Sequence, residues 1–258
     1  MITVDIMTRP MSAANELVRK LGPHVHRVYV EAFGEPAPFR SRFTSYLQRL
    51  GTTLGPRRPR ESEIFGSYAA VDARLTRPFG HRGFDQVAPE LRANPPDLLV
   101  LLGSSLVPES IIRSPRLGCL NVHLGLAPRY RGLFTTEWAI LFGELEGIGV
   151  TIHEVTPAVD AGRVVARGWP KLEARDDARS IDLRLLALGT DLIREVVAGL
   201  EAGQRLAPES QSSKGRLFLR REFLPAHAKL VEERVRAGMI SSFSPRSRKR
   251  VEGPFWRT

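Results

Sequence analysis

Two polar side chains stand close together near the end of an apolar stretch of this sequence. Asn121 and His123 lie at positions i and i+2, so a strand would point both to one face. Side chains of these types can exchange protons near neutral pH and donate hydrogen bonds. In a buried strand each costs about 1–3 kcal/mol unless it meets a partner. The pair alone is equally consistent with a hydrogen-bonded structural feature and with a functional site.

The segments around the pair have the pattern of a mostly parallel α/β sheet. Residues 97–103 form a continuous apolar run that ends in a glycine, as does a strand buried on both faces. Strands are expected at 2–7, 27–32, 97–103, 118–124, 149–155 and 163–167, and helices at 12–21, 85–93, 108–112, 135–143 and 178–200. This alternation predicts a Rossmann-like sheet with helices on both faces. The carboxyl ends of such strands face the ligand crevice, which places Asn121 and His123 at its edge.

Less regular sequence flanks this pattern. Residues 34–60 are rich in Pro, Gly and Arg and predict loop with one short helix near 43–50. Beyond residue 205, a strand or hairpin is expected at 215–223 and a closing helix at 227–237. We therefore expect a main α/β domain over residues 1–205 and a short basic α/β extension over residues 206–258.

The net charge of +10 is unusual for a chain of 258 residues and is concentrated at one end. Residues 212–258 hold 12 Lys and Arg against 4 Asp and Glu, whereas the remainder is nearly balanced. The run is densest from Arg246 through Arg248 and Lys249 to Arg250. It is interpreted either as a solvated tail or as a patch for phosphate or nucleotide groups.

Composition narrows the class of protein. A single cysteine excludes an internal disulfide framework and a Cys-rich zinc site, and no metal site is expected. The longest apolar run, Leu98–Leu102, is too short to span a bilayer. Asp5 and Arg9 stand where a signal peptide would be apolar. A cytoplasmic protein without a membrane partner is expected.

Four short motifs follow one another in the sequence and together resemble those of a known family. They are Asn121-x-His123, the turn Pro128-x-Tyr130-Arg131-Gly132, the strand Gly149-Val150-Thr151-Ile152-His153, and Asp160-x-Gly162. In this order and spacing the chain resembles the folate-dependent formyltransferases, which act on glycinamide ribonucleotide, methionyl-tRNA or nucleotide-linked amino sugars. The resemblance covers residues 96–203.

The resemblance implies a formyltransferase fold and a reaction. A formyl group would move from 10-formyltetrahydrofolate to an amine through a tetrahedral intermediate with a developing oxyanion. Asn121 would donate its amide to that oxygen, and His123 would exchange the protons. Asp160 would hold the imidazole and favour its charged form. These three residues are the expected catalytic set, whereas His153 is expected to position or pack and Arg131 to tie the turn.

The same resemblance places the folate site. One wall is expected from the backbone of the loop after residue 102, and the other from the segment 154–160. The expected cofactor-binding residues are Gly103, Ser104, Ser105, Leu106, Val107, Val155 and Val159. The first turn, 7–12, has no glycine, so a phosphate-binding backbone nest is not expected there, although Arg9 could supply charge.

Three functions remain open from the sequence. The first is formyl transfer to a small amine, such as a nucleotide-linked amino sugar or a specialised-metabolite precursor, with a homodimer expected from the resemblance. The second keeps the site but uses water, which gives a 10-formyltetrahydrofolate hydrolase. The third is a nucleic-acid-binding protein on the same scaffold. The basic tail has few interleaved aromatic residues, which argues against the third.

Overall fold

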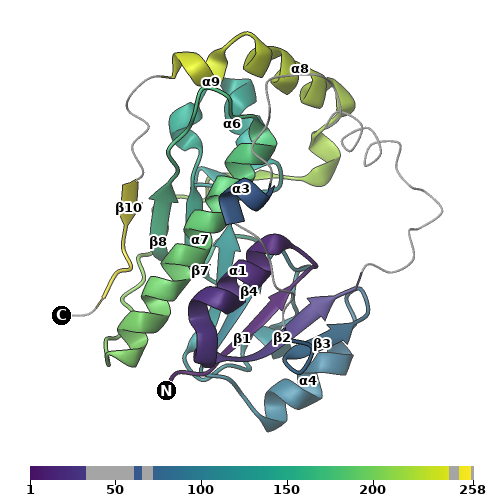
Figure 1. The fold of residues 1–258 in the computed structure, drawn as a ribbon, viewed down its shortest axis with the longest axis vertical. Coiled ribbons are helices and arrows are strands. Elements are labelled where there is room, and N and C mark those ends of the chain that lie inside the picture. Colours follow the sequence, from purple (N-terminus) through teal and green to yellow (C-terminus); the bar gives the residue numbers. More distant parts are fainter. Residues whose placement is uncertain (33–60, 66–71, 244–249, 257–258) are drawn as a thin grey trace.

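The computed structural model describes residues 1–32, 61–65, 72–243 and 250–256. The helix expected near 43–50 lies outside these residues, as do Arg246, Arg248 and Lys249 of the basic run. The described residues form an eight-stranded sheet flanked by helices, with a two-stranded sheet in addition (Figure 1).

The strand order across the large sheet is β10-β8-β7-β5-β4-β1-β2-β3. Its strands are β1 (Val4–Thr8), β2 (Val25–Glu31), β3 (Thr76–Phe79), β4 (Leu98–Leu102), β5 (Gly118–His123), β7 (Val150–Glu154), β8 (Val164–Trp169) and β10 (Arg250–Glu252). Neighbours from β3 to β5 pair in parallel, whereas β7 and β10 run antiparallel to the strands beside them. Six of these eight described strands point the same way, which confirms the prediction of a mostly parallel sheet.

Alternate side chains of the central strands pack into two separate hydrophobic clusters. In β4, Leu98, Val100 and Leu102 join one cluster, while Leu99 and Leu101 join the other. Because successive side chains of a strand point to opposite faces, each cluster covers one face of the sheet. The expected helices on both faces are therefore present, since both clusters include helical residues.

The helices divide between these two faces. They are α1 (Ser12–Leu21), α3 (Glu61–Phe65), α4 (Phe84–Ala93), α5 (Glu109–Ile112), α6 (Thr135–Phe142), α7 (Ala178–Glu201), α8 (Pro225–Arg236) and α9 (Met239–Ser242), with 3-10 turns at Gly22–His24, Leu145–Gly147 and Arg220–Glu222. Helices α4 and α5 contribute to one cluster, and α1, α6 and α7 to the other. Figure 1 shows α1 beside the long helix α7.

Helix α7 illustrates why the sequence folds as it does. Asp177 accepts a hydrogen bond from the Ser180 amide at 2.8 Å, and the Ser180 hydroxyl accepts one from the Asp177 amide at 2.9 Å. This reciprocal cap satisfies two amides that the first turn leaves without helical partners. The predicted apolar stripe is buried throughout, at Ile181, Leu185, Leu188, Leu192 and Val196. Helix α7 is thereby fixed against the sheet.

The C-terminal segment joins both sheets. Strand β9 (Arg216–Phe218) pairs in parallel with β6 (Tyr130–Gly132), so the segment expected as a strand or hairpin is a short strand followed by a 3-10 turn. Strand β10 extends the edge of the large sheet, where Arg250 lies opposite Trp169. The division of the chain near residue 205 stays a prediction.

Candidate active site

The carboxyl edge of the parallel strands gathers the polar residues of the crevice. Arg9 follows β1, Glu31 ends β2, Arg82 follows β3, Gly103 follows β4, and His123 ends β5. Strand β7 runs antiparallel to β5 and sets His153 opposite Asn121 and Thr151 opposite His123. The loop after β7 then brings Asp160 back to this pair. Five strands far apart in sequence thus meet at one edge, as expected for an open α/β sheet.

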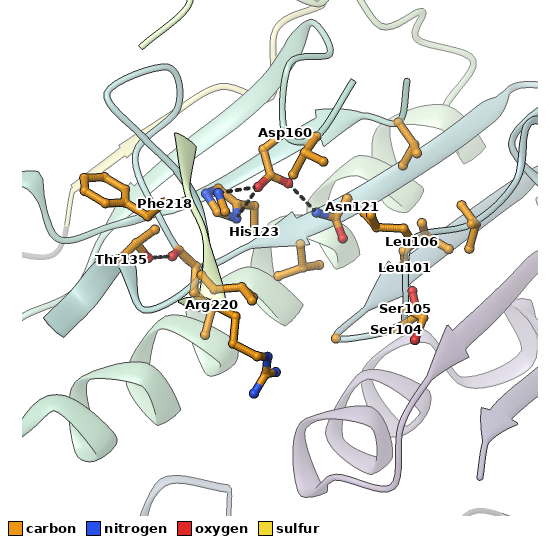
Figure 2. Close-up of a pocket in the computed structure, with 18 of the residues that line it drawn as sticks. Leu101, Ser104, Ser105, Leu106, Asn121, His123, Thr135, Asp160, Phe218 and Arg220 are labelled. Carbon is orange, nitrogen blue, oxygen red and sulfur yellow. Dashed lines mark hydrogen bonds and ion pairs between the residues drawn. The ribbon is translucent and has the colours of Figure 1, made fainter. Parts of the chain in front are cut away.

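Asp160 lies at the centre of a polar cluster. Its Oδ2 is 3.4 Å from Nδ1 of His123, and its Oδ1 is 3.3 Å from Nε2 of His153 and 3.4 Å from Nδ2 of Asn121. Figure 2 shows Asn121 and His123 on either side of the carboxylate. The Gly132 amide donates to Oδ2 at 2.8 Å. The structure therefore brings together the three side chains expected from the sequence, and adds His153.

The hydrogen bonds of His123 determine which of its ring nitrogens can accept a proton. Nε2 lies 2.9 Å from the carbonyl oxygen of Tyr130, to which it donates. The other nitrogen, Nδ1, faces Asp160 and carries a hydrogen only when the ring is charged. Burial lowers the pKa of His123 below 6.5, and the charge of Asp160 only partly offsets this. At pH 7 the neutral ring thus presents a proton acceptor beside a carboxylate.

The carboxylate of Asp160 stays ionised. Burial acts to raise its pKa, but His123, His153 and the Gly132 amide outweigh burial and hold the pKa well below 3.8. Since the side chain is only 11 % exposed, its charge acts on the imidazoles with little screening by water. Asp160 is therefore suited to orient and charge-balance a histidine rather than to exchange protons itself.

The Asp160 loop is tied down by a residue of the C-terminal segment. The backbone of Asp160 is left-handed, with φ of 47°, which is uncommon for any residue except glycine. The side-chain amide of Gln211 donates to the carbonyl oxygens of Asp160 at 2.9 Å and of Gly162 at 2.7 Å. A side chain on Gly162 would overlap the Glu154 carbonyl, so the loop closes tightly on β7. This clamp had no signal in the sequence, because residue 211 lies outside every motif.

A pocket of about 740 Å³ contains the cluster. All ten residues expected at the site line it: Asn121, His123, Asp160, Gly103, Ser104, Ser105, Leu106, Val107, Val155 and Val159. Figure 2 shows Ser104 and Ser105 on one side of Asn121, and Thr135 and Arg220 on the other. Their roles in catalysis or folate binding stay predictions, while their common location is a fact of the fold.

Two further carboxyl groups line the same pocket and were missed by sequence reasoning. Glu137 stands in the first turn of α6, and Asp182, in α7, accepts a hydrogen bond from the Thr136 hydroxyl at 2.6 Å. Burial raises the pKa of both groups, and the negative charge of Asp182 raises that of Glu137 further. Neither belongs to a motif, so only the packing of α6 on α7 reveals them.

Metal-binding clusters and membrane-spanning helices are absent among the residues that the structure describes. No group of three or more His, Cys, Asp or Glu side chains there could hold a metal ion. No helix there is long and apolar enough to cross a membrane.

Solved structures with the same fold include several N-formyltransferases. The 4-N formyltransferase of Francisella tularensis has a TM-score of 0.59 at 15% identity, with 100% of this chain and 98% of that chain covered. An N-formyltransferase of Helicobacter canadensis, in complex with folinic acid and dTDP-3-aminofucose, has a TM-score of 0.56 at 17% identity, with 87% and 73% covered. Identities this low show the fold alone.

Sequence comparison shows a family relationship in addition to the shared fold. The methionyl-tRNA formyltransferase of Trichlorobacter lovleyi is 35% identical over 127 residues, which are 49% of this chain and 40% of that protein. The chain thus matches about two fifths of the length of this relative. The family described as formyl transferase matches residues 69–197, half of the chain, and this range includes all four motifs and the polar cluster around Asp160. The chain therefore belongs to the formyl transferase family.

Proposed function

We propose that this protein transfers a formyl group from 10-formyltetrahydrofolate to the amine of a small acceptor. One observation carries the proposal: an amide donor, a neutral imidazole and an ionised carboxylate lie together in one pocket. Membership of the formyl transferase family supports it. Asn121, His123 and Asp160 are the proposed catalytic residues.

The three side chains suit the chemistry of formyl transfer. A bond forms between the acceptor nitrogen and the formyl carbon, the bond from that carbon to N10 of the folate breaks, and one proton passes from the amine to N10. The Asn121 amide donates to Oδ1 of Asp160 at 3.4 Å and lies 3.2 Å from Nε2 of His153, and in the proposed reaction one of the two amide hydrogens turns to the developing oxyanion. His123 takes the amine proton and returns it to the leaving nitrogen, while Asp160 stabilises the charged ring between these events.

The pocket walls suit a folate. The proposed wall 103–107 carries Leu106, which is 67% exposed, and Leu133 at the pocket rim is 45% exposed. Exposed leucine side chains that line a pocket offer apolar contact to a flat aromatic ring. Gly103 has a φ of 68°, and a side chain there would press on Met11, so this left-handed turn at the start of the wall requires a glycine. Val155 and Val159 supply the proposed opposite wall.

A small amine is the proposed acceptor. Glu137 and Asp182 line the pocket near the proposed reaction centre, where their carboxyl groups can exchange hydrogen bonds with an amine at this end of the pocket. A nucleotide-linked amino sugar fits this description and is named as a ligand of the Helicobacter canadensis enzyme. The pocket volume of about 740 Å³ lies within the range of pockets that hold small molecules.

Release of tetrahydrofolate from 10-formyltetrahydrofolate tests the proposal. The amine panel comprises dTDP-linked amino sugars, glycinamide ribonucleotide and methionyl-tRNA, with an arm that contains no amine. We expect release that depends on one of the small amines. Equal release without an amine would assign the protein as a hydrolase, and release only with methionyl-tRNA would refute a small acceptor.

A further inference from the structure

His153 lies beside the amide of Asn121, and the reaction proposed above gives it no role. It stands opposite Asn121 where β7 pairs with β5, and its side chain is buried. Its Nε2 is 3.2 Å from Nδ2 of Asn121 and 3.3 Å from Oδ1 of Asp160. Both neighbours belong to the proposed catalytic set, so a change at His153 reaches the reaction through them.

The backbone determines which ring nitrogen of His153 carries a hydrogen. Nδ1 lies 2.8 Å from the carbonyl oxygen of Glu154, which can only accept, so Nδ1 donates to it. In the neutral ring Nε2 is then an acceptor. A charge on His153 would oppose the charge that His123 takes up in the proposed reaction, because the two ring centres are 6.1 Å apart. The proposed reaction therefore requires a neutral His153, whose Nε2 accepts from Asn121.

The amide nitrogen of Asn121 faces two acceptors that lie close together. Nδ2 is 3.2 Å from Nε2 of His153 and 3.4 Å from Oδ1 of Asp160, and those two atoms are 3.3 Å apart. Seen from Nδ2, the acceptors are therefore only about 60° apart, whereas the two N–H bonds of an amide diverge by about 120°. One hydrogen is accordingly shared between the two acceptors, and the second points away from both.

The second hydrogen of Asn121 is left for a ligand. Asn121 lines the pocket, and its Nδ2 has no further acceptor among the residues that the structure describes. Figure 2 shows the contact between Nδ2 and Asp160. The reversed amide would set its oxygen against two acceptors, Nε2 of His153 and the carboxylate of Asp160. His153 thus helps to hold the donor end of the amide in place.

We propose that His153 is a positioning residue, which accepts one hydrogen of Asn121 and thereby directs the other toward the oxygen of the formyl group. The proposal rests on the proposed function, in which that oxygen becomes the oxyanion. Orientation of the donor matters because a hydrogen bond that is aimed in advance needs no rearrangement when the charge develops. His153 itself neither contacts this oxygen nor exchanges a proton.

NMR of the ¹⁵N-labelled free protein tests the geometry without a ligand. At pH 7 we expect the ring nitrogen shifts of a neutral His153 with its hydrogen on Nδ1. We also expect two well-separated proton shifts for the side-chain amide of Asn121, assigned with Asn121→Ala, because only one of these protons is hydrogen-bonded. A His153 ring that is charged or carries its hydrogen on Nε2 would overturn the proposal.

Two substitutions of His153 separate its two hydrogen bonds. His153→Asn keeps a donor for the Glu154 carbonyl but is too short to accept from Asn121, whereas His153→Gln returns an acceptor near the position of Nε2. We expect His153→Asn to bring the two Asn121 proton shifts together and His153→Gln to keep them apart. Asn121 shifts that stay unchanged in His153→Asn would contradict the positioning role. Thermal unfolding shows which variants are folded, and the wild-type spectrum tests the geometry independently of them.

Binding of 10-formylfolate, compared with binding of folate, measures the consequence at the formyl oxygen. The ratio of the two Kd values, from calorimetric titration, gives the contribution of the formyl group. We expect His153→Asn to reduce this ratio about fivefold, the effect of one hydrogen bond that is no longer aligned, and His153→Gln to keep it within twofold of wild type. In an Asn121→Ala background, His153→Asn should change the ratio by less than about 1.5-fold.

The outcomes distinguish this role from packing and from the proposed function. An equal reduction of the ratio with and without Asn121 would show that His153 acts by packing, and an unchanged ratio in His153→Asn would also overturn the positioning role. Failure of the wild type to bind either folate compound would refute the proposed function, and with it the inference that rests on it.

Discussion

His123 and Asp160 form the part of the site whose chemistry depends most on their surroundings. Burial disfavours the charged imidazole, whereas the carboxylate 3.4 Å away favours it. These opposed effects leave the ring neutral at pH 7 but able to accept a proton when an amine presents one. A balance of this kind is characteristic of general bases that operate near neutrality.

Replacement of Asp160 by Asn should therefore change both rate and pH dependence. In the wild type, activity should rise with pH through a midpoint below 6.5, because only the neutral ring accepts a proton. Asp160→Asn removes the charge that raises the pKa of His123, so the midpoint should move further down while kcat falls by about 10²–10⁴. The pH profile of kcat/KM measures both effects. A midpoint that stays in place or rises would show that Asp160 does not act on His123.

Glu137 should destabilise the free protein at high pH. Its folded pKa lies above 4.5, so above that pH the folded state holds more protons than the unfolded state and stability falls as pH rises. Glu137→Gln removes this penalty and should raise Tm by about 2–4 °C at pH 9, the change that about 1 kcal/mol produces in a protein of this size. The gain should be smaller at pH 5.

Glu195→Gln, at an exposed position of α7, is the control for loss of one negative charge. Differential scanning calorimetry at the two pH values distinguishes the variants. An equal gain at both pH values, or the same gain in the control, would exclude a raised pKa as the cause.

The loop that carries Asp160 depends on a distant segment for its shape. Gln211 holds the carbonyls of Asp160 and Gly162, and the Gly132 amide of β6 holds the carboxylate itself. Strand β6 is in turn paired with β9 of the C-terminal segment. Residues beyond position 205 therefore shape the site even though none of the four motifs includes them.

Gln211→Leu should lower kcat about tenfold while leaving the affinity for folinic acid nearly unchanged, because Gln211 donates to Asp160 and Gly162 and to neither of the proposed folate-binding residues Val155 and Val159. The pH midpoint should also fall, since Asp160 would no longer be held 3.4 Å from His123. Steady-state kinetics across pH tests this, with Gln204→Leu as the control at an exposed position after α7. Unchanged kcat and midpoint in Gln211→Leu would show that the clamp is dispensable.

Substitutions at two glycines distinguish the free-energy cost of a left-handed backbone from the cost of a steric overlap. Gly132 has φ of 90°, and a side chain there would overlap the Phe218 carbonyl of β9, whereas Gly143 has φ of 71° with open space around it. Gly143→Ala should cost about 1 kcal/mol, the price of the left-handed conformation alone. Gly132→Ala should cost more and also lower activity, because β6 carries the amide that holds Asp160. Urea unfolding compares the two, and equal losses would contradict a close contact between β6 and β9.

Much of the architecture follows from local sequence patterns. The apolar run of β4, the stripe and cap of α7 and the polar end of β5 each reflect the period of a strand or helix, so their positions were predictable. Strand β3, with Arg77 and Pro78, lacks a strand pattern, yet it is formed at the sheet edge, where proline is tolerated. Strand β10 was not predicted, because it begins at Arg250, the last residue of a basic run that was interpreted as a solvated tail or an anion-binding patch.

In the site, too, the residues that follow a local sequence pattern were predictable, whereas contacts between distant segments were not. Asn121 and His123 share a face by strand period alone, and the resemblance added Asp160. The hydrogen bonds that Glu31 accepts from His81, Arg82 and Ser105, and those of the clamp by Gln211, join residues that are between 49 and 74 positions apart. Such contacts arise from chain topology and carry no local period, so one sequence does not reveal them.

Transfer of a ¹³C-labelled formyl group is the decisive measurement for this protein. The labelled donor is incubated with the amine panel and wild type, Asn121→Ala or His123→Ala, and the formamide carbon is followed by NMR. We expect wild type to form one labelled formamide and both variants, folded by circular dichroism, to form it at least about 100-fold more slowly. Wild-type rates in both variants, or labelled formate as the sole product of the wild type, would contradict formyl transfer by this site.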